Sequence, residues 1–360
     1  MRARIVLLPG DGIGPEVLAA ARLVLDGISA RFHHDFQFES HAIGGAALRQ
    51  GLAPLPDETR LACANADAVL LGAVGDPAFD ARPPGQRPES ALLQIRRELK
   101  LFANLRPARV WPGLEAAGPL DPKVLQGTDM LVVRELTGGL YYGEPRGIAE
   151  DGGEAWNTMR YSRPEIERIA HVAFDVARTR RRRVTSVDKA NVLETSRLWR
   201  QVVNEVARGY PDVQIEHMYV DACAMKIALA PASFDVLLTP NLFGDILSDE
   251  AGAIVGSLGL LPSASTGEGS GLFEPVHGSA PDLAGRNVAN PVGAILSAAM
   301  LLRHALRLEP EAAAIEQAVE AALRSGARTV DLAGTGTGLG TREMAEAISA
   351  AVDRQPMKAG

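Results

Sequence analysis

Short apolar runs alternate with amphipathic segments along most of this chain, and this alternation constrains its fold more than any other feature. The apolar runs lie at residues 4–8, 68–74, 130–136, 184–187, 215–221 and 234–238. Runs of this kind predict buried strands, and most of the segments between them have helical periodicity. Strands that alternate with helices predict an α/β protein with an open, mostly parallel sheet.

Length, charge and cysteine content exclude several classes of protein. The chain has 360 residues, enough for two domains, and its net charge of −7 offers no general attraction for nucleic acid. Cys63 and Cys223 have no metal-ligand spacing and fit a reducing cytoplasm. The N-terminus does not resemble a signal peptide, and the late apolar run 292–302 is too short to span a membrane. We therefore expect a cytoplasmic protein that binds neither nucleic acid nor membranes.

The stretch 239–250, T-P-N-L-F-G-D-I-L-S-D-E, carries the first chemical signal. Pro240 ends the preceding strand, and Asn241 is expected to cap a short helix. Asp245 and Asp249 are four residues apart on that helix, so they project from one face and repel each other weakly. Mg²⁺ or Mn²⁺ would turn the pair into a binding site, because both ions prefer carboxylate oxygens. The alternative is a solvated acidic face near a helix N-terminus.

Further charged residues lie within predicted strands or near their ends. Asp221 ends the run 215–221 and could join the two aspartates at a metal. Arg134 lies inside a strand, where a guanidinium needs an anion or a carboxylate partner. Arg96, Arg106 and Arg134 could each hold a carboxylate bidentately, and a plain surface position is the alternative for Arg96 and Arg106.

Two residues are candidates for proton transfer. Lys189 follows a predicted strand, and desolvation or neighbouring cations lower a lysine pKa toward neutrality. Tyr141 lies in a glycine-rich turn and could donate a proton. A dicarboxylic 2-hydroxy acid is the substrate type that needs the metal, the arginines and the proton-transfer residues together.

A glycine turn, P-G-D-G-I-G-P-E at residues 9–16, joins the first strand to a helix. Its spacing is G-x-G-x-G and not the dinucleotide fingerprint G-x-G-x-x-G, so it predicts a tight turn beside a ligand. Residues 76–89 are rich in proline and glycine and are expected to form a loop over a site. Residues 274–285 are also expected to form a loop. The run Arg180–Arg183 could touch RNA, but a solvated helix C-terminus is the favoured interpretation.

Six long motifs lie along nearly the whole chain: L-P-G-D-G-I-G-P-E (8–16), F-A-N-L-R-P (102–107), R-E-L-T-G-G-L-Y-Y-G-E-P-R-G (134–147), S-V-D-K-A-N (186–191), F-G-D-I-L-S-D (243–249) and H-G-S-A-P-D-L-A-G (277–285). In this order they resemble the metal-dependent decarboxylating 2-hydroxy acid dehydrogenases, the family of the isocitrate and isopropylmalate dehydrogenases. Motifs of this length are specific.

The resemblance implies an isopropylmalate dehydrogenase-like fold with the site in a cleft between two domains. Residues 1–101 and 256–360 would form an NAD-binding domain that carries both termini. Residues 102–255 would form an inserted domain for substrate binding and dimerisation, with a projecting arm near 142–161. NAD binding in this family is not of the Rossmann type. The implied cofactor contacts are Asp76, Glu89, His277, Gly278, Ser279, Ala280, Pro281, Asp282 and Asn290.

The implied reaction is oxidation of (2R,3S)-3-isopropylmalate by NAD⁺, followed by loss of CO₂, to give 4-methyl-2-oxopentanoate for leucine biosynthesis. Arg96, Arg106 and Arg134 would orient the substrate carboxylates. Asp245 and Asp249 would hold Mg²⁺ or Mn²⁺.

The resemblance also implies a homodimer with shared active sites. Asp221, which would contact both metal and substrate, and Lys189 would come from the other subunit. Lys189 would help to remove the hydroxyl proton, and Tyr141 would protonate C3.

Other substrates of the family remain as alternatives, namely isocitrate, homoisocitrate, and tartrate or malate. The segment that begins at Glu89 is expected to contact the variable group of the substrate. Leu92 and Leu93 favour an isopropyl group, because burying each methylene contributes about 0.8 kcal/mol. A carboxylate there would lose water without gaining a partner. A non-catalytic RNA-binding or assembly protein is the alternative from another class.

Overall fold

The computed structural model describes residues 1–334 and 336–354, and the chain divides into two compact units. Unit 1 comprises Met1–Leu101, Trp111–Ala117 and the chain from Gly256 onward; unit 2 comprises Phe102–Val110 and Gly118–Val255. The sequence analysis assigned residues 111–117 to the inserted domain. They lie with unit 1, where Trp111 and Leu114 are buried and Arg328 Nη2 donates to the Gly113 carbonyl at 2.6 Å.

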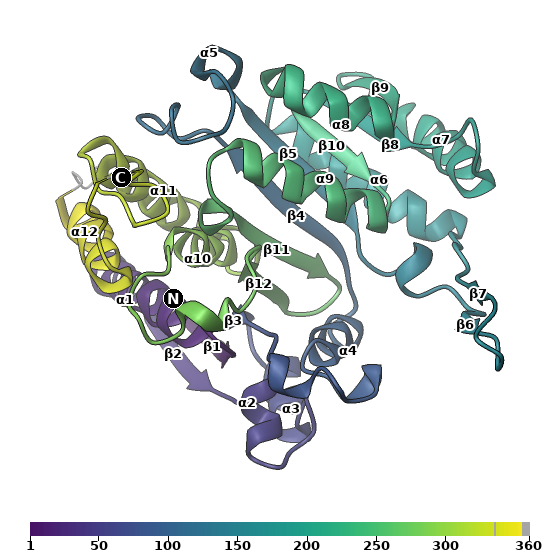
Figure 1. Cartoon of the computed structure of the whole chain (residues 1–360). Helices are drawn as coiled ribbons and strands as arrows, with labels where there is room; N and C mark the ends of the chain where they lie inside the picture. Colours follow the sequence, from purple (N-terminus) through teal and green to yellow (C-terminus); the bar gives the residue numbers. More distant parts are fainter. Residues whose placement is uncertain (335, 355–360) are drawn as a thin grey trace. The chain divides into compact units, whose positions relative to one another are not determined.

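Unit 1 contains a mostly parallel set of five strands (Figure 1). The strands are β1 (Arg2–Gly10), β2 (Asp35–Ser40), β3 (Ala68–Ala73), β11 (Pro262–Gly267) and β12 (Gly271–Pro275), in the order β2-β1-β3-β12-β11. β11 and β12 form an antiparallel hairpin, and the other neighbours are parallel. β3 is buried along its whole length, as expected for a parallel strand covered on both faces.

The helices of unit 1 are α1 (Gly14–Phe32), α2 (Gly45–Arg49), α3 (Asp57–Ala64), α4 (Ser90–Glu98), α10 (Val292–His304), α11 (Glu309–Arg324) and α12 (Thr341–Arg354). Short 3-10 turns are η1 (Pro77–Phe79), η2 (Pro84–Gln86), η5 (Leu258–Leu260) and η6 (Pro281–Leu283). α10 is apolar on all sides and buried from Val292 to Leu302, because α1, α11 and the β11–β12 hairpin pack around it. Within the described residues, no helix has the length and apolar character needed to cross a membrane.

Unit 2 repeats this arrangement with a second set of five strands. They are β4 (Leu101–Arg109), β5 (Asp129–Glu135), β8 (Arg183–Asp188), β9 (Gln214–Tyr219) and β10 (Val236–Thr239), in the order β4-β5-β10-β8-β9. β4 is antiparallel to β5, and the others are parallel. The remaining elements are α5 (Pro122–Leu125), α6 (Arg163–Arg178), α7 (Glu194–Ala207), α8 (Val220–Leu229), α9 (Asn241–Ile254), η3 (Gly139–Tyr141) and η4 (Pro231–Ser233). A capping box begins α6: Ser162 N donates to Glu165 Oε2 at 2.7 Å.

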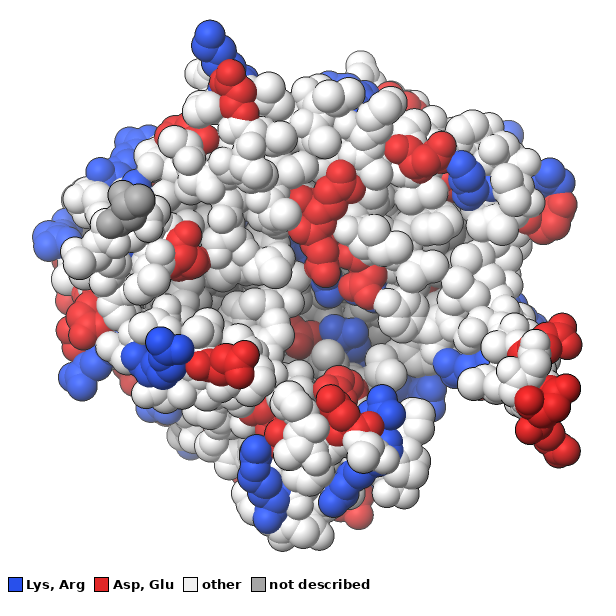
Figure 2. Space-filling model, viewed as in Figure 1, with Lys and Arg blue, Asp and Glu red and all other residues white. Residues whose placement is uncertain are grey.

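A small antiparallel hairpin, β6 (Gly147–Ile148) and β7 (Ala155–Trp156), extends away from the helices of unit 2 (Figure 1). It lies where the sequence analysis expected a projecting arm. Ile148 is 73% exposed and Trp156 is 43% exposed. Acidic side chains gather at its tip (Figure 2), where Glu150, Asp151 and Glu154 are exposed.

The arginine run after α6 is not a solvated helix end, so that interpretation is wrong for two of its residues. Arg180 Nε binds Asp235 Oδ1 at 2.9 Å, and its Nη2 binds Asp129 Oδ1 at 2.9 Å. Arg181 donates to the carbonyls of Asp129 and Phe234. These bonds tie the turn to the beginning of β5 and to the residues just before β10, because buried Asp235 requires a cationic partner.

Candidate active site

The candidate active site in unit 2 is built around Asp245 of α9. β10 ends at Thr239, and α9 begins at Asn241 with Pro240 in the extended conformation before it. The prediction that Asn241 caps the helix is wrong, since its side chain makes no capping hydrogen bond. Asn241 is instead the first helical residue, and its side chain faces Arg134. Asp245 follows one turn later on the same helix.

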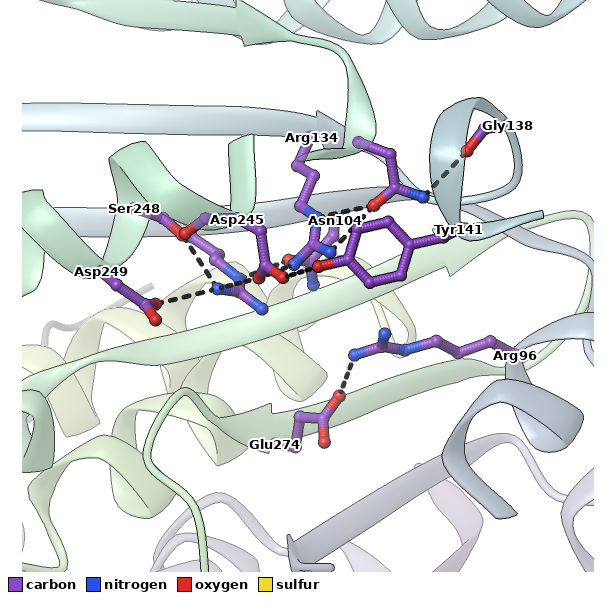
Figure 3. Close-up of polar contacts among 11 residues, drawn as sticks. Arg96, Asn104, Arg134, Gly138, Tyr141, Asp245, Ser248, Asp249 and Glu274 are labelled. Carbon is purple, nitrogen blue, oxygen red and sulfur yellow. Dashed lines mark hydrogen bonds and ion pairs between the residues drawn. The ribbon is translucent and has the colours of Figure 1, made fainter. Parts of the chain in front are cut away.

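Arg134 reaches Asp245 from β5. Its side chain is buried, and its Nη1 donates to Asp245 Oδ1 (Figure 3). Nε and Nη2 donate to Asn241 Oδ1 at 3.0 and 2.8 Å. The sequence predicted an anion or a carboxylate as the partner of this arginine, and Asp245 is that carboxylate. A buried guanidinium without such a partner would be costly.

Arg106 approaches from β4, where Asn104 lies directly opposite Arg134 in the antiparallel pair. Its Nε donates to Asn104 Oδ1 at 2.7 Å. Its Nη1 donates to Ser248 Oγ at 2.8 Å, and lies 3.5 Å from Asp245 Oδ1 and 3.4 Å from Asp249 Oδ1. The arginine therefore holds one face of α9 beside the two aspartates.

Tyr141, the last residue of η3, donates its hydroxyl proton to Asp245 Oδ2 at 2.5 Å (Figure 3). The turn before it requires glycine. A Cβ on Gly138 or Gly139 would lie 2.6 Å from the Tyr161 side chain, and Gly139 has φ +74°. We call Arg106, Arg134, Tyr141, Asp245 and Asp249 the Asp245 cluster.

Charge and burial set the protonation states in this cluster. Burial by itself would raise the pKa of Asp245, but Arg134, the Tyr141 hydroxyl and Arg106 together hold that pKa below its usual value. Burial and the bond to Asp245 raise the pKa of Tyr141, and burial raises that of Asp249. At neutral pH Asp245 is therefore charged while Tyr141 keeps its proton, as a general acid requires.

Lys189 and Asp221 form a separate pair in the same unit. Lys189 follows β8, and its Nζ binds Asp221 Oδ1 at 2.5 Å. The hydrogen bond from Lys189 lowers the pKa of Asp221, whose side chain is 66% exposed. The predicted strand 215–221 is two residues too long: β9 ends at Tyr219, and Asp221 lies in the first turn of α8.

The predicted metal ligands Asp221, Asp245 and Asp249 do not come together within one chain. Among the described residues, no group of three or more His, Cys, Asp or Glu side chains is arranged to hold a metal ion. Asp245 and Asp249 do lie one turn apart on α9, as predicted. Two carboxylates there match the ligand type that Mg²⁺ and Mn²⁺ prefer, and a third ligand would have to come from elsewhere.

Arg96 lies in unit 1 and has a protein partner. Its Nη2 donates to Glu274 Oε1 at 2.8 Å, and both side chains are 10% exposed (Figure 3). Glu274 belongs to β12 and not to the expected loop 274–285, and the sequence did not predict its bond to Arg96. On the same helix as Arg96, Leu92 is half-buried and Leu93 is 39% exposed.

Three of the predicted cofactor residues meet around Gly75 in unit 1. A Cβ on Gly75 would lie 3.2 Å from Ser279 Oγ and 3.3 Å from Glu89 Oε1, and Asp76 caps η1 through Ala78 N. The backbone of Ser279 is held by the first glycine turn, where Ile13 N donates to Ser279 O at 2.7 Å. The tight turn that the glycine spacing predicted is therefore present, and it packs against the loop that carries Ser279.

Asp11 is a residue of this region whose role the sequence analysis missed. Its carboxylate accepts hydrogen bonds from Gly75 N at 2.9 Å, Gly45 N at 2.9 Å and Ala46 N at 2.7 Å. The side chain thus fixes the end of β3 relative to the start of α2. Its place between two glycines of positive φ, Gly10 and Gly12, is the signal that could have revealed it.

The loop after β12 carries the other predicted cofactor residues. His277 Nδ1 bonds the Gly278 carbonyl at 2.9 Å, and burial lowers the pKa of His277, so the ring is neutral at pH 7. Its Nε2 is buried without a partner among the described residues, which suits a bound ligand. Asn290 differs: its amide donates to Asp331 at 3.0 Å and accepts from Val292 N at 3.1 Å, so it holds the start of α10.

The last four predicted residues lie on the same loop. Gly278, Pro281 and Asp282 are exposed, and Ala280 has the left-handed φ of 39°.

Residues 4–348 match the family model described as isocitrate/isopropylmalate dehydrogenase. The 3-isopropylmalate dehydrogenase of Aquifex aeolicus is 52% identical over 98% of this chain and 97% of its own length. That of Bacillus subtilis is 55% identical over 98% of each chain.

Solved structures of the same kind are also similar. The isocitrate dehydrogenase of Methylococcus capsulatus aligns with a TM-score of 0.87 at 37% identity, covering 98% of this chain and 100% of that one. A β-decarboxylating dehydrogenase of Thermococcus kodakarensis aligns with a TM-score of 0.80 at 37% identity, covering 98% and 96%. The chain is therefore an oxidoreductase that belongs to the isocitrate/isopropylmalate dehydrogenase family.

Proposed function

We propose that this enzyme oxidises (2R,3S)-3-isopropylmalate with NAD⁺ and decarboxylates the product to 4-methyl-2-oxopentanoate, in leucine biosynthesis. The observation that carries the proposal is the convergence of Arg106, Arg134 and Tyr141 on Asp245. Two cations beside one ionised carboxylate and one protonated phenol suit a dicarboxylic hydroxy acid whose product must be reprotonated.

The choice of isopropylmalate has separate support. Relatives of that name are 52–57% identical to this chain, whereas the structure titled isocitrate dehydrogenase is 37% identical. Leu92 and Leu93 offer apolar surface on α4 for the isopropyl group. Arg96 on this helix, which the resemblance assigns to a substrate carboxylate, binds Glu274, so any dicarboxylic substrate would have to compete with that bond and Arg96 does not discriminate among them.

The residues present fit a divalent cation and a nicotinamide cofactor. Asp245 and Asp249 would hold Mg²⁺ or Mn²⁺, which supplies Lewis acidity to the substrate oxygens. Asp76, Glu89 and His277 belong to the set proposed for NAD⁺, which supplies the hydride acceptor. Arg106 and Arg134 would bind and orient carboxylates, while Tyr141 would deliver its proton to carbon after CO₂ leaves.

We further propose that Lys189 and Asp221 serve the site of a second copy of this chain. Asp221, Met225 and Leu229 recur at every fourth position of α8, and all three are exposed. α9 packs against α8 and exposes Ile246 and Asp249. Exposed apolar side chains of this size on neighbouring helices suit an interface. A carboxylate from a second copy would supply a third ligand, since the described residues of one chain hold no group of three such side chains.

The substrate test uses purified protein with Mn²⁺ and NAD⁺. NADH formation is followed with isopropylmalate, isocitrate, homoisocitrate, malate and tartrate as substrates. We expect the highest kcat/KM with isopropylmalate. More efficient turnover of isocitrate or tartrate would overturn the assignment of Leu92 and Leu93.

The cofactor test compares NAD⁺ with NADP⁺ in the same assay. Asp282 is exposed on η6 and can accept hydrogen bonds from ribose hydroxyls, whereas a 2′-phosphate would face its carboxylate. We expect NAD⁺ to be preferred by about 10²-fold or more in kcat/KM, since juxtaposed like charges cost several kcal/mol. Asp282→Asn should reduce that ratio, and equal use of both cofactors by the unmodified enzyme would contradict the proposal.

A further inference from the structure

Asn241 makes a set of bonds that the proposed chemistry does not use. It is the first residue of α9 and is 1% exposed. Its Oδ1 accepts from Arg134 Nε and Nη2, and its Nδ2 donates to the Gly138 carbonyl at 3.2 Å. One amide thus connects a strand, a loop and the beginning of a helix.

The two partners of the Asn241 side chain, Arg134 and Gly138, both lead back to Asp245. Figure 3 labels these two partners and Asp245. Arg134 uses its remaining terminal nitrogen, Nη1, for Asp245 Oδ1. Gly138 directly precedes η3, which ends in Tyr141 and places its hydroxyl 2.5 Å from Asp245 Oδ2. The two paths from Asn241 therefore meet at the two oxygens of a single carboxylate, one turn along the same helix.

An ordinary capping role does not account for this side chain. The backbone N–H of Asn241 already donates to the Tyr161 hydroxyl at 2.8 Å, and the side chain makes no capping bond. The position also requires an acceptor and a donor together. Aspartate would set a carboxylate against the Gly138 carbonyl, and leucine would offer neither group to the buried arginine.

We propose that Asn241 is a positioning residue that aims Arg134 Nη1 and the Tyr141 hydroxyl at one reacting centre. The role of that centre rests on the proposed function, and Asn241 acts through its two neighbours without touching substrate. A guanidinium bound through Nε and Nη2 cannot rotate, so Nη1 keeps one direction. A displacement of 1 Å at a reacting group costs about 10²-fold in rate.

Glu135 offers a matched control. Its buried carboxylate accepts from Thr137 N and Gly138 N, both at 2.8 Å, and so holds the same loop. It lies next to Arg134 in β5, where neighbouring side chains point to opposite faces. Glu135→Gln therefore disturbs the loop of Tyr141 from the face away from the arginine.

The experiment measures KM and kcat for isopropylmalate in Asn241→Leu, Glu135→Gln, Tyr141→Phe and the double variant Asn241→Leu/Tyr141→Phe. Asn241→Leu should lower kcat/KM about 10²-fold, through both a higher KM and a lower kcat. Glu135→Gln should lower kcat and leave KM unchanged. In the Tyr141→Phe background, Asn241→Leu should keep its effect on KM and lose its effect on kcat. Loss of kcat by the same factor in both backgrounds would mean a merely structural role and would overturn the proposal.

A ligand-free crystal structure of Asn241→Leu decides the positioning without any substrate. We expect Arg134 Nη1, the Tyr141 hydroxyl or both to have left Asp245. If both bonds persist unchanged, the positioning proposal is wrong, whatever the enzyme oxidises. If the unmodified enzyme oxidises no substrate of the panel, the proposed function is wrong, and the crystal structure still decides the role of Asn241. If the leucine variant fails to fold, the same measurements are made on Asn241→Ser, whose short hydroxyl cannot reach both partners.

Discussion

The Asp245 cluster and the Lys189–Asp221 pair both lie near the carboxyl ends of strands in unit 2, but they differ in how far their cationic side chains are buried. The carboxylates differ less, since Asp249 is 63% exposed. The Arg134 and Arg106 side chains are 4% and 11% exposed, whereas those of Lys189 and Asp221 are 27% and 66% exposed. Each member of the cluster binds another member. Lys189 and Asp221 bind each other in a setting more open to solvent, and Lys189 Nζ also lies 5.8 Å from the centre of the Tyr219 ring. Such exposure is what we expect of residues that complete the site of another chain.

The support beneath the two regions is nevertheless similar. Arg134 is held by buried Asn241, and the residue before Lys189, Asp188, is buried and bound by Arg200 at 2.8 and 2.9 Å. The backbone before Lys189 is therefore held in place although the lysine side chain itself is partly exposed. The exposure of Lys189 and Asp221 therefore does not come from a lack of local support, which agrees with the proposal that they serve a second chain.

The largest expected effect concerns Asp245. Asp245→Asn removes the charge that balances Arg134 and one of the two carboxylates on α9 that would bind a cation. With the unmodified enzyme as reference, kcat/KM at saturating Mn²⁺ should fall by about 10³-fold, because metal ions supply several kcal/mol of charge stabilisation. Asp212→Asn, at an exposed aspartate of the same unit, should not change it. A loss below tenfold would show that Asp245 is not at the reacting centre.

The next effect concerns Tyr141. Tyr141→Phe removes a hydroxyl that stays protonated at neutral pH and is needed only after oxidation. Product formation should slow by about 10²-fold or more, while hydride transfer in a single turnover slows less. Tyr210→Phe, which loses a hydroxyl bonded to Asp175, serves as control and should leave both rates intact. Equal slowing of both steps by Tyr141→Phe would contradict the assigned role.

A smaller effect is expected at Arg106. Lysine keeps the positive charge, but one ammonium group cannot replace Nε at Asn104 and Nη1 at Ser248 together. Arg106→Lys should raise KM for isopropylmalate about tenfold and change kcat less, as expected for the loss of one charge-assisted hydrogen bond. Arg208→Lys, at an exposed arginine of the same unit, is the matched control and should leave KM and kcat unchanged. An unchanged KM in Arg106→Lys would remove Arg106 from substrate binding.

The smallest expected effect is on the pH dependence of stability and concerns His217. Burial and the charge of Arg200 lower the pKa of His217 below its usual 6.5, although the charge of Asp188 opposes them. As the pH falls below 6.5, the histidine is protonated in the unfolded chain before it is protonated in the folded chain. This histidine therefore lowers the free energy of unfolding as the pH falls. Urea unfolding at pH 7.5 and 5.5 should show a smaller pH dependence in His217→Gln than in the unmodified protein. The same dependence in both would show that His217 does not contribute.

Local signals in the sequence predicted much of this architecture. The apolar runs became parallel strands, and the carboxylates at positions 245 and 249 lie on one helix, because period and spacing are local properties. The β11–β12 hairpin was missed, since Ser263 and Ser265 lack the apolar character of a buried strand and depend on α10 to cover them.

Partners distant in sequence were harder to foresee. Arg96 and Glu274 are 178 positions apart, and Arg134 and Asn241 are 107 apart. Asn241 was expected to cap its helix because that is the commonest local use of asparagine before a helix. Only the fold shows that a buried arginine takes the side chain instead. Local spacing thus indicated candidate residues for the chemistry, but not the side chains that hold them in place.

The central claim, that Lys189 of one chain serves the site of another, has a direct test. Lys189→Ala and Arg106→Ala chains should each be inactive alone. In a mixed dimer with shared sites, one site receives both substitutions and the other receives neither. Co-refolding equal amounts should therefore restore about a quarter of the unmodified activity, because random pairing makes half of the dimers mixed and each has one intact site. If differently tagged chains are shown to pair and yet no activity returns, Lys189 serves its own chain and the shared-site account is wrong.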